Sequence, residues 1–388
     1  MNIILFDNQT RTHLLPFTFT RPLAEIRIGI TTIREKWERI LKTQASFFTQ
    51  DYLAELFPIA ITNDNLFIAG NLLPNQELVN AIKMLQTGEV LKDTQNSVLA
   101  LRAGSFEEFT DLENFKTIVY EPPFVAIRAK QDIFNLNHEA LVNDFHELKK
   151  RRSSAVLSNS NTLIGDPKNL FIEEGATIEG AIINCETGPV FIGQNAQVME
   201  GVCIRGPFAL LEGATVKMGA KIYGATTIGP HCKVGGELNN VVMFGYSNKA
   251  HDGFLGNAVI GEWCNIGAGS DASNLKNNYD EVAQWNYATQ LYENTGLQFC
   301  GLMLGDHSKC GIGSMFNTGT VVGVACNLFG SDFHRSFIPS FSMGNRTKGY
   351  IQNAIEKVLE SERTMFLRRV IEMSESYCRM LLYLSRLR

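Results

Sequence analysis

The chain has 388 residues, of which 45% are hydrophobic and 19% charged. This composition indicates a folded globular protein of two or three domains and excludes a disordered chain. A net charge of −5 at pH 7 gives no overall positive field, so we expect small-molecule substrates, no nucleic acid and no membrane partner.

The N-terminal sequence MNIILFDNQTRTHLLP has no basic region and reaches Asp7 early, so it does not look like a signal peptide. No apolar stretch approaches the ~20 residues that span a bilayer. The eight cysteines are scattered without CxxC pairs, which predicts buried thiols rather than a disulfide framework. These features predict a cytoplasmic protein.

Residues 1–152 alternate short apolar runs with helical patterns. The apolar runs are MNIILF, ASFFTQ, LFIAG and FKTIVYE, and the helical patterns are TTIREKWERILK and NQELVNAIKMLQ. This alternation is typical of an α/β domain with a largely parallel sheet. We therefore predict a Rossmann-like α/β domain over 1–152, and we interpret the basic run KKRRSS at 149–154 as the linker that follows it.

A period of six runs through residues 153–346. In steps of six, aliphatic residues recur without a break at Ile192, Val198, Ile204, Leu210, Val216, Ile222, Ile228 and Val234. The phase slips at Asn240 and returns at Ile260 and Ile266, and a third run follows at Leu304, Cys310, Phe316 and Val322. Glycine commonly follows the periodic residue, as in the pairs at 164–165, 192–193, 228–229, 260–261 and 266–267.

Neither a helix, with a period near 3.6, nor a simple strand, with a period of 2, explains this spacing. Short strands joined by tight turns do, when each places one aliphatic residue inward and three of them close a triangular coil. We therefore predict a parallel β-helix of hexapeptide repeats over 153–346, with glycine supplying positive φ at its corners. The alternative, a glycine-rich β-sandwich, does not account for eight consecutive matches.

The repeat is interrupted at 270–299 by a polar and aromatic segment without a six-residue period. Long excursions from a regular scaffold are often functional loops. Residues 347–388 then carry apolar residues at helical spacing, with no proline and no glycine after position 349. We expect a C-terminal helical extension there, broken at most once, which caps the solenoid or bridges subunits.

The residues that carry chemistry gather in the segment 245–276, which holds His251, Asn265, Asn274 and Lys276. Histidine suits proton transfer near neutral pH, and asparagine orients a nucleophile or an acyl oxygen without titrating. Equivalent corners of a β-helix recur about every 18 residues, so His251 and the stretch from Asn265 to Asn274 are expected on neighbouring coils facing one cleft. A lone histidine with a purely structural role is the competing interpretation.

The segment resembles the acetyltransferase domain of the bifunctional UDP-N-acetylglucosamine diphosphorylase/glucosamine-1-phosphate N-acetyltransferase family, in its archaeal and alternative bacterial branch. The resemblance spans some 25 residues, and the matching positions within them are His251, Phe254, Gly256, Ile260–Gly261, Asn265–Gly269 and Ser273–Leu275. It implies a trimer of left-handed β-helices with sites between subunits.

The resemblance also implies roles for single residues. His251 would be the general base that takes a proton from the amino group of glucosamine 1-phosphate, which then attacks the thioester of acetyl-CoA. Asn265 and Asn274 would contact the sugar or acyl group. Ala268 and Asn317 would contact coenzyme A.

Two departures from the family pattern concern the sugar. Phe254 stands where the family often has tyrosine, so one hydroxyl hydrogen bond is lost. A family lysine that holds the sugar phosphate falls at Asn239. Lys249 or Lys276 could replace it, and the exact amino sugar stays open.

The first domain carries two arginines ten residues apart, Arg11 and Arg21, which flank Leu14–Pro16. Nucleotidyl transfer needs cations that offset charge on the phosphorus under attack. Thr10–Arg11 and Arg21–Pro22 resemble the sugar-phosphate nucleotidyltransferase signature, which implies that both arginines bind nucleotide phosphates.

Two departures concern this activity. Asp7–Gln9 replaces the family's glycine-rich loop, so fewer backbone amides approach the phosphates. Asn71 stands where the family has its Mg²⁺-binding aspartate, and Asp7 or Asp132 would have to compensate, because an amide binds Mg²⁺ more weakly than a carboxylate.

Four functions remain open. The first is a bifunctional enzyme that acetylates glucosamine 1-phosphate and joins the product to UTP with Mg²⁺, forming UDP-N-acetylglucosamine. The second is a single-activity amino-sugar N-acyltransferase whose degenerate first domain only binds a nucleotide sugar. The third is a zinc carbonic anhydrase, for which His231, His251 and His307 lack the required close pair. The fourth, a trimerising scaffold, leaves the Asn265–Gly269 and Asn274 match unexplained.

Overall fold

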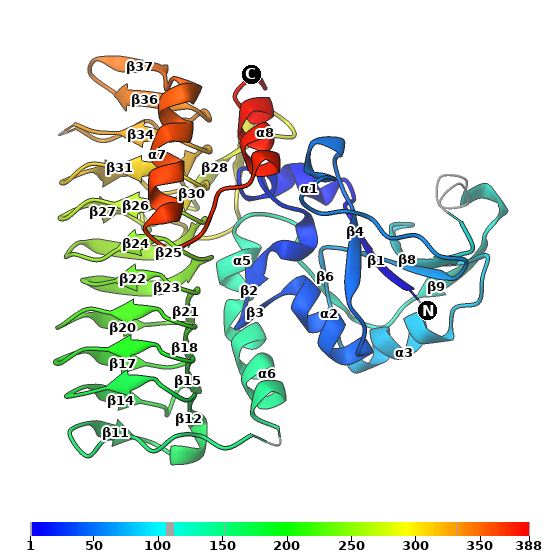
Figure 1. The fold of residues 1–388 in the computed structure, drawn as a ribbon, viewed down its shortest axis with the longest axis horizontal. Coiled ribbons are helices and arrows are strands. Elements are labelled where there is room, and N and C mark those ends of the chain that lie inside the picture. The colour runs from blue at the N-terminus through cyan, green and yellow to red at the C-terminus, as the bar shows by residue number, and fades with distance from the viewer. Residues whose placement is uncertain (1, 106–111, 151, 331, 388) are drawn as a thin grey trace.

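The computed structural model describes residues 2–105, 112–150, 152–330 and 332–387. An α/β domain lies beside a tall β-helix, and two C-terminal helices lie at the upper part of the β-helix (Figure 1). No helix in these ranges is both long and apolar enough to cross a membrane.

The sheet of the α/β domain has the strand order β4-β1-β5-β8-β7-β9. Strands β1, β4 and β5 are mutually parallel, but β8 runs antiparallel to both β5 and β7. The expectation of a largely parallel sheet is confirmed: of the six strands only β8 is reversed, because a short connection joins β7 directly to β8 in a hairpin. The strands are β1 (Asn2–Phe6), β4 (Ala45–Phe48), β5 (Asn65–Ala69), β7 (Glu89–Asp93), β8 (Val98–Ala103) and β9 (Lys116–Tyr120).

Both helical patterns form helices, and α2 begins with a capping box. The Thr32 side chain accepts from the Glu35 N–H, and the Glu35 carboxylate accepts from the Thr32 N–H, so two helix-end donors are satisfied. The helices are α1 (Thr10–His13), α2 (Ile33–Leu41), α3 (Gln76–Met84), α5 (Asp132–Asn135) and α6 (Asn137–Lys149). Two small ribbons complete the domain, β2 (Arg27–Ile28) with β3 (Thr31–Thr32) and β6 (Leu72–Leu73) with β10 (Val125–Ala126).

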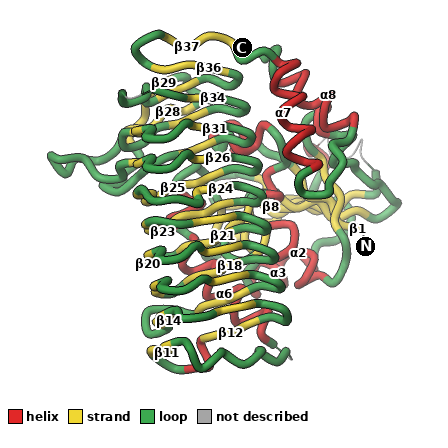
Figure 2. The backbone as a smooth tube through the Cα atoms, turned by 60° about the vertical axis from the view of Figure 1, so that its left-hand side comes forward, coloured by secondary structure: helices red, strands yellow, loops and turns green. Residues whose placement is uncertain are grey.

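The β-helix has three faces of parallel strands stacked coil on coil (Figure 2). We call them the outer, docking and groove faces. The outer face contains β11 (Thr162–Ile164), β14 (Ile182–Asn184), β17 (Cys203–Arg205), β20 (Lys221–Tyr223), β27 (Asp271–Ala272) and β32 (Met315–Phe316). The docking face contains β12 (Leu170–Ile172), β15 (Val190–Ile192), β18 (Phe208–Leu210), β21 (Thr226–Ile228), β30 (Met303–Leu304), β33 (Val321–Val322) and β35 (Phe337–Ile338).

The longer strands β23 (Glu237–Met243) and β25 (Phe254–Ile260) serve both of these faces. The groove face contains β13 (Thr177–Ile178), β16 (Gln197–Val198), β19 (Thr215–Val216), β22 (Lys233–Val234), β24 (Asn248–Lys249), β26 (Asn265–Ile266), β31 (Lys309–Cys310), β34 (Asn327–Leu328) and β36 (Ser342–Asn345).

The period of six is confirmed as the inward column of the β-helix. The eight periodic residues of the first run, taken in steps of six from Ile192 to Val234, are each at most 2% exposed. The periodic residues of the later runs are buried as well. Burial of this apolar column out of water is the main force that holds the coils in register.

The prediction that glycine supplies positive φ at the corners is confirmed at Gly165, Gly213 and Gly269, among others, but most of the glycines that directly follow the periodic residues have another role. Gly193, Gly229, Gly261 and Gly267 have ordinary φ angles, but a Cβ at Gly229 would lie 1.8 Å from the Phe244 carbonyl oxygen of the next coil. Glycine is needed there because the next coil passes too close for any side chain. The positive φ falls two residues later, at His231 (58°) and Trp263 (60°), where outward aromatic side chains occupy the corner.

The segment 270–299 contains an antiparallel hairpin, β28 (Ala283–Asn286) and β29 (Leu291–Asn294). It packs between the two domains: Trp285 stacks on Phe337 at 4.3 Å, and Tyr287 meets Phe19 edge to face at 5.5 Å. The Asn286 amide nitrogen also lies 3.1 Å from the His13 ring nitrogen. This excursion therefore joins the α/β domain to the β-helix.

The docking face carries the α/β domain. Leu141 and Phe145 of α6 pack on Phe171, Phe191 and their neighbours along β12 to β21. Higher up, Val242, Phe244, Val259, Met303 and Val321 belong to the same apolar cluster as the core of the α/β domain. One continuous core thus fixes the two domains to each other.

The C-terminal segment begins with a strand, β37 (Gly349–Gln352), which is antiparallel to β36. The helical extension predicted for this segment therefore does not start at its first residues. Two helices follow, α7 (Ile355–Leu367) and α8 (Glu375–Leu384). Phe366 of α7 stacks on Trp263 at 4.0 Å, and Trp263 stacks on Tyr246 at 4.3 Å. Helix α7 is therefore bound to one corner of the β-helix.

Helix α7 ends in a Schellman motif whose C′ residue is Val370. The Ile371 N–H donates to the Phe366 carbonyl and the Val370 N–H donates to the Leu367 carbonyl, while Val370 has a φ of 58° and is 96% exposed. A β-branched residue is strained in this left-handed conformation, which glycine adopts freely.

We expect Val370→Gly to raise the free energy of unfolding by about 0.5–1 kcal/mol, the relief of strain less the backbone entropy that glycine loses. A urea titration followed by tryptophan fluorescence measures this. Val370→Ala keeps the Cβ in the left-handed conformation and should give no comparable gain. A loss of stability in Val370→Gly would contradict the interpretation.

Candidate active site

A polar groove with a volume of about 650 Å³ lies on the groove face, beside the end of α7. Outward side chains from successive coils line it, because the strands pair Lys233 with Asn248, Asn248 with Asn265, and Asn265 with Lys309. Tyr246 and Trp263 border it at one corner. Its size falls within the range of small-molecule sites.

His251 and Ala268 line the same groove together with Asn265. His251 lies in the turn between β24 and β25, exposed at the corner between the groove and outer faces. The structure therefore brings three of the predicted acetyl-transfer residues into one cavity, with the imidazole outside the apolar column.

Lys249 does not reach the groove, and its predicted contact with sugar phosphate is corrected. Its side chain points into the interior of the β-helix, where it is 1% exposed, and its Nζ donates to the His251 carbonyl oxygen at 2.5 Å. Burial lowers the pKa of the Lys249 ammonium, while Asp252 and Asp271 raise it in part. The lysine supports the turn that presents His251.

A second group of predicted residues lies on the outer face. A Cβ at Gly256 would meet the Asn274 amide nitrogen and the Phe254 ring, both at 2.6 Å, so glycine at this position lets the two side chains come together. The Asn274 amide donates to Asn257 Oδ1 at 2.7 Å. Asn317 is exposed just after β32, on the coil above Asn274.

Lys276 lies in the excursion, and its Nζ donates to the Glu281 carbonyl at 2.7 Å. The predicted site residues therefore fall into two sets on adjacent faces, and His251 lies at the corner between them. A single chain does not bring both sets into the groove.

A second cavity, of about 310 Å³, lies where the strands of the α/β sheet end. Asn8 follows β1 and Asn71 follows β5, and Asp93 and Arg128 also line this cavity. The crevice beyond the carboxyl ends of parallel strands is where α/β sheets bind ligands. This cavity is the candidate nucleotide site.

The two signature arginines do not line that cavity. Arg11 is buried; its Nε lies 3.1 Å from Asp7 Oδ2, and its guanidinium donates to the Tyr52 hydroxyl at 2.6 Å. Burial raises the pKa of Asp7, although Thr49, Leu23 and Arg11 oppose the shift.

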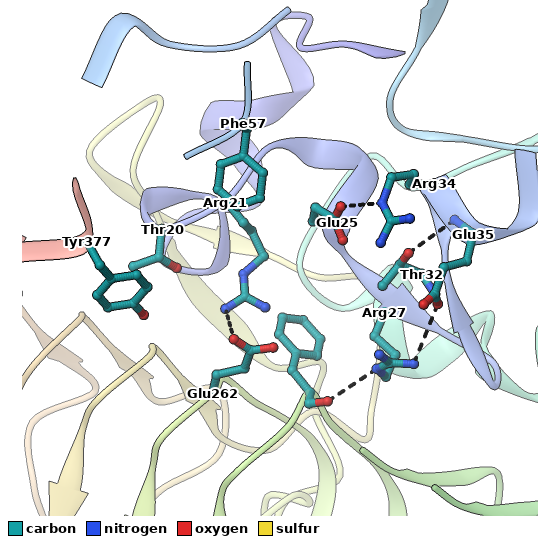
Figure 3. A pocket seen from close by; sticks show the side chains of 11 residues that line it. Thr20, Arg21, Glu25, Arg27, Thr32, Arg34, Glu35, Phe57, Glu262 and Tyr377 are labelled. Carbon is teal, nitrogen blue, oxygen red and sulfur yellow. Dashed lines mark hydrogen bonds and ion pairs between the residues drawn. The ribbon is translucent and has the colours of Figure 1, made fainter. Parts of the chain in front are cut away.

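Arg21 points away from the sheet, toward the β-helix (Figure 3). It forms a buried ion pair with Asp306, and its guanidinium lies 3.4 Å from Glu262. The predicted phosphate contacts of Arg11 and Arg21 are therefore corrected, because both guanidinium groups are held by carboxylates of the chain itself.

The residues at the strand ends do not fit a Mg²⁺ site. Asn71 Oδ1 accepts from Asn8 and its amide nitrogen donates to the Ile127 carbonyl, so both ends of the amide are engaged. Asp132 Oδ2 accepts from the N–H groups of Arg128 and Ala129 and caps a turn. Within the described ranges, no group of three or more His, Cys, Asp or Glu residues could hold a metal ion. We derive no metal-dependent step.

Three groove residues were not predicted. Asn248 Oδ1 is buried without a hydrogen-bond donor in the described part of the chain, although the side chain lines the groove. Arg368 and Arg369 enter from the end of α7. The spacing from Asn248 to Asn265 is 17 residues, which could have indicated Asn248, but no signal in the sequence relates α7 to this face.

A family profile described as "Sugar nucleotidyl transferase" matches residues 3–153. The chain is 25% identical to the "Bifunctional protein GlmU" of Synechococcus elongatus over 234 residues, which cover 54% of this chain and 47% of that protein. A protein of the same name from Gloeobacter violaceus is 30% identical over 219 residues, which cover 49% and 46%. Over about half of its length the chain is therefore similar to GlmU, and its first domain matches the sugar nucleotidyl transferase profile.

The chain spans about half the length of the curated relatives it matches. Among solved structures, it is similar to a putative acetyltransferase from Bacillus cereus, with 15% identity, a TM-score of 0.24 and coverage of 60% of this chain and 100% of that one. An Arabidopsis UDP-N-acetylglucosamine acyltransferase gives 15% identity, a TM-score of 0.25 and coverage of 53% and 77%.

Proposed function

We propose that the chain is a transferase of sugar-nucleotide biosynthesis, with acetyl transfer from acetyl-CoA to the amino group of glucosamine 1-phosphate as its best-supported activity. The observation that carries this is the exposed His251 imidazole at the corner of the groove that also contains Asn265 and Ala268. A base at that position would take the proton of the amine while its nitrogen bonds to the thioester carbon. The carbon–sulfur bond then breaks, and coenzyme A leaves as its thiol.

The complete acetyl-transfer site is proposed to form between subunits of a homotrimer. Phe254, Asn274 and Asn317 lie on the outer face, whereas Asn265 and Ala268 lie on the groove face. A neighbouring copy that brings its outer face to this groove would unite the two sets around His251. The free cysteines, seven of the eight buried, suit a reducing compartment, so we propose the cytoplasm as the location.

Uridylyl transfer from UTP to N-acetylglucosamine 1-phosphate, forming UDP-N-acetylglucosamine, is the proposed second activity. It is supported by the family match over residues 3–153 and by the cavity at the strand ends. Arg128 is the cation that lines this cavity. Because the strand-end residues do not fit Mg²⁺, any magnesium would have to arrive with the nucleotide phosphates.

An alternative is favoured by one observation, the internal pairing of Arg11 and Arg21. With both arginines paired inside the protein, the first domain would bind a nucleotide sugar without catalysing nucleotidyl transfer. The protein would then be an amino-sugar N-acyltransferase alone.

One assay separates these functions. The full chain is incubated with acetyl-CoA, glucosamine 1-phosphate, UTP and Mg²⁺, and free thiol and pyrophosphate are followed independently. We expect thiol release that requires the amino sugar, and pyrophosphate release that requires N-acetylglucosamine 1-phosphate. Thiol release alone would establish the single-activity alternative. Absence of sugar-dependent thiol release would overturn the proposed acetyl transfer.

A further inference from the structure

The end of α7 concentrates positive charge on the groove. Arg368 and Arg369 line it from the helix, and Lys233 lines it from β22 of the β-helix. The residues that line the groove include no aspartate or glutamate. No ion pair to Arg368, Arg369 or Lys233 is present within the described ranges.

The buried carboxylate of α7 is engaged elsewhere. Glu362 of α7 is buried between His307, at 2.6 Å, and the ammonium of Lys309. Burial raises the pKa of Glu362, but His307 and Lys309 outweigh it and hold the pKa below its usual value. Lys309 is thus neutralised within the protein, while Lys233, Arg368 and Arg369 are not.

The three cations also act on one another. Burial lowers the pKa of the Lys233 ammonium, and the positive charges of Arg369, Lys217 and Arg368 lower it further, with no carboxylate opposing them. Like charges held this close cost free energy in the protein alone. Compensation of the helix dipole accounts for arginines at a helix end, but it does not account for Lys233, which comes from another element.

The position of the arginines is fixed by packing. The stacked rings of Tyr246, Trp263 and Phe366 bind the last turn of α7 to the corner that borders the groove. The Schellman motif then ends the helix at Arg368 and Arg369. A buried acceptor in the same groove, Asn248 Oδ1, has no donor from the described residues.

We infer that Lys233, Arg368 and Arg369 form a phosphate-binding subsite that holds a phosphate group of a substrate whose reactive end lies at His251. The inference rests on the proposed function for the identity of the substrates, which are a sugar 1-phosphate and coenzyme A, both phosphorylated. A guanidinium group can bind two phosphate oxygens at once, and such charge-assisted hydrogen bonds are stronger than neutral ones. The C-terminal helix α7 thereby becomes part of the binding site.

The subsite is tested by calorimetric titration of the full-length protein with three ligands: coenzyme A, 3′-dephospho-coenzyme A and glucosamine 1-phosphate. Arg368→Gln/Arg369→Gln is compared with the wild type and with Lys357→Gln, a control that removes an exposed charge from the same helix. We expect at least about tenfold weaker binding of one phosphorylated ligand, since each lost charge-assisted contact is worth about that factor. Lys233→Gln should weaken binding of the same ligand, and Arg368→Lys/Arg369→Lys, which keeps the charge but not the paired contacts, should lose less affinity than the glutamine pair.

The ligand that loses affinity identifies the phosphate. Loss for coenzyme A alone assigns its 3′-phosphate, equal loss for both coenzymes assigns the diphosphate, and loss for glucosamine 1-phosphate assigns the sugar phosphate. Binding of all three ligands equal to that of the Lys357→Gln control would overturn the subsite. Because titration needs no turnover, a protein that binds these ligands in an arginine-dependent way but transfers no acetyl group would refute the proposed function and leave the subsite standing.

Discussion

Replacing His251 with alanine should reduce acetyl transfer by about 100-fold or more, the usual contribution of a positioned general base. The imidazole is exposed at the corner of the groove, so its removal creates no core cavity and the fold should be unaffected. The measurement is thiol release from acetyl-CoA with glucosamine 1-phosphate as acceptor. Pyrophosphate release by the first domain, which lies on another face of the β-helix, should be unchanged.

Two further variants test whether the loss of acetyl transfer is specific to the imidazole of His251. His251→Gln keeps a polar side chain of similar size but takes no proton, and it should be as inactive as the alanine variant. His138→Ala removes an exposed histidine from α6 and should retain full activity. More than half of the wild-type thiol release in His251→Ala would remove this residue from the mechanism.

Arg21→Met should lower the free energy of unfolding by about 3–5 kcal/mol, because it leaves a buried carboxylate without its cation. Asp306 is fully buried; its Oδ2 accepts from the Thr20 hydroxyl at 2.7 Å and from Arg21, and its Oδ1 accepts from the Glu262 N–H at 2.9 Å. The pair joins the α/β domain to the β-helix, so the loss should appear as a lower urea midpoint measured by tryptophan fluorescence.

Arg379→Met is the matched control for Arg21→Met. Arg379 also joins two parts of the chain, through Glu55, but both side chains are more than half exposed, so solvent screens the pair and a much smaller loss is expected. The double variant Arg21→Met/Asp306→Leu should recover stability relative to Arg21→Met. Weaker nucleotide binding by Arg21→Met with an unchanged urea midpoint would instead restore the phosphate-binding role predicted from the sequence.

Part of the candidate site could be predicted from the sequence, and there is a physical reason why the rest could not. The recurrence of corners along the coils predicts His251, Asn265 and Asn274 on one cleft; His251 and Asn265 do line one groove, whereas Asn274 lies on the outer face. The paired positions Val234 and Lys249 are only 15 positions apart, instead of the about 18 of a regular coil. Counting in sixes therefore loses its phase at Asn240, and the count does not show that Lys249 faces inward.

The sequence by itself determined the coil, its inward column and the alternation of helix and strand in the first domain, because these depend on neighbours a few residues apart. The tertiary structure alone decided that Arg21 pairs with Asp306, 285 positions away, and that α7 brings Arg368 and Arg369 to the groove. Charged side chains choose partners by distance and burial in the folded chain. A local pattern records which side of its own element a residue faces, but not which distant element will lie against it.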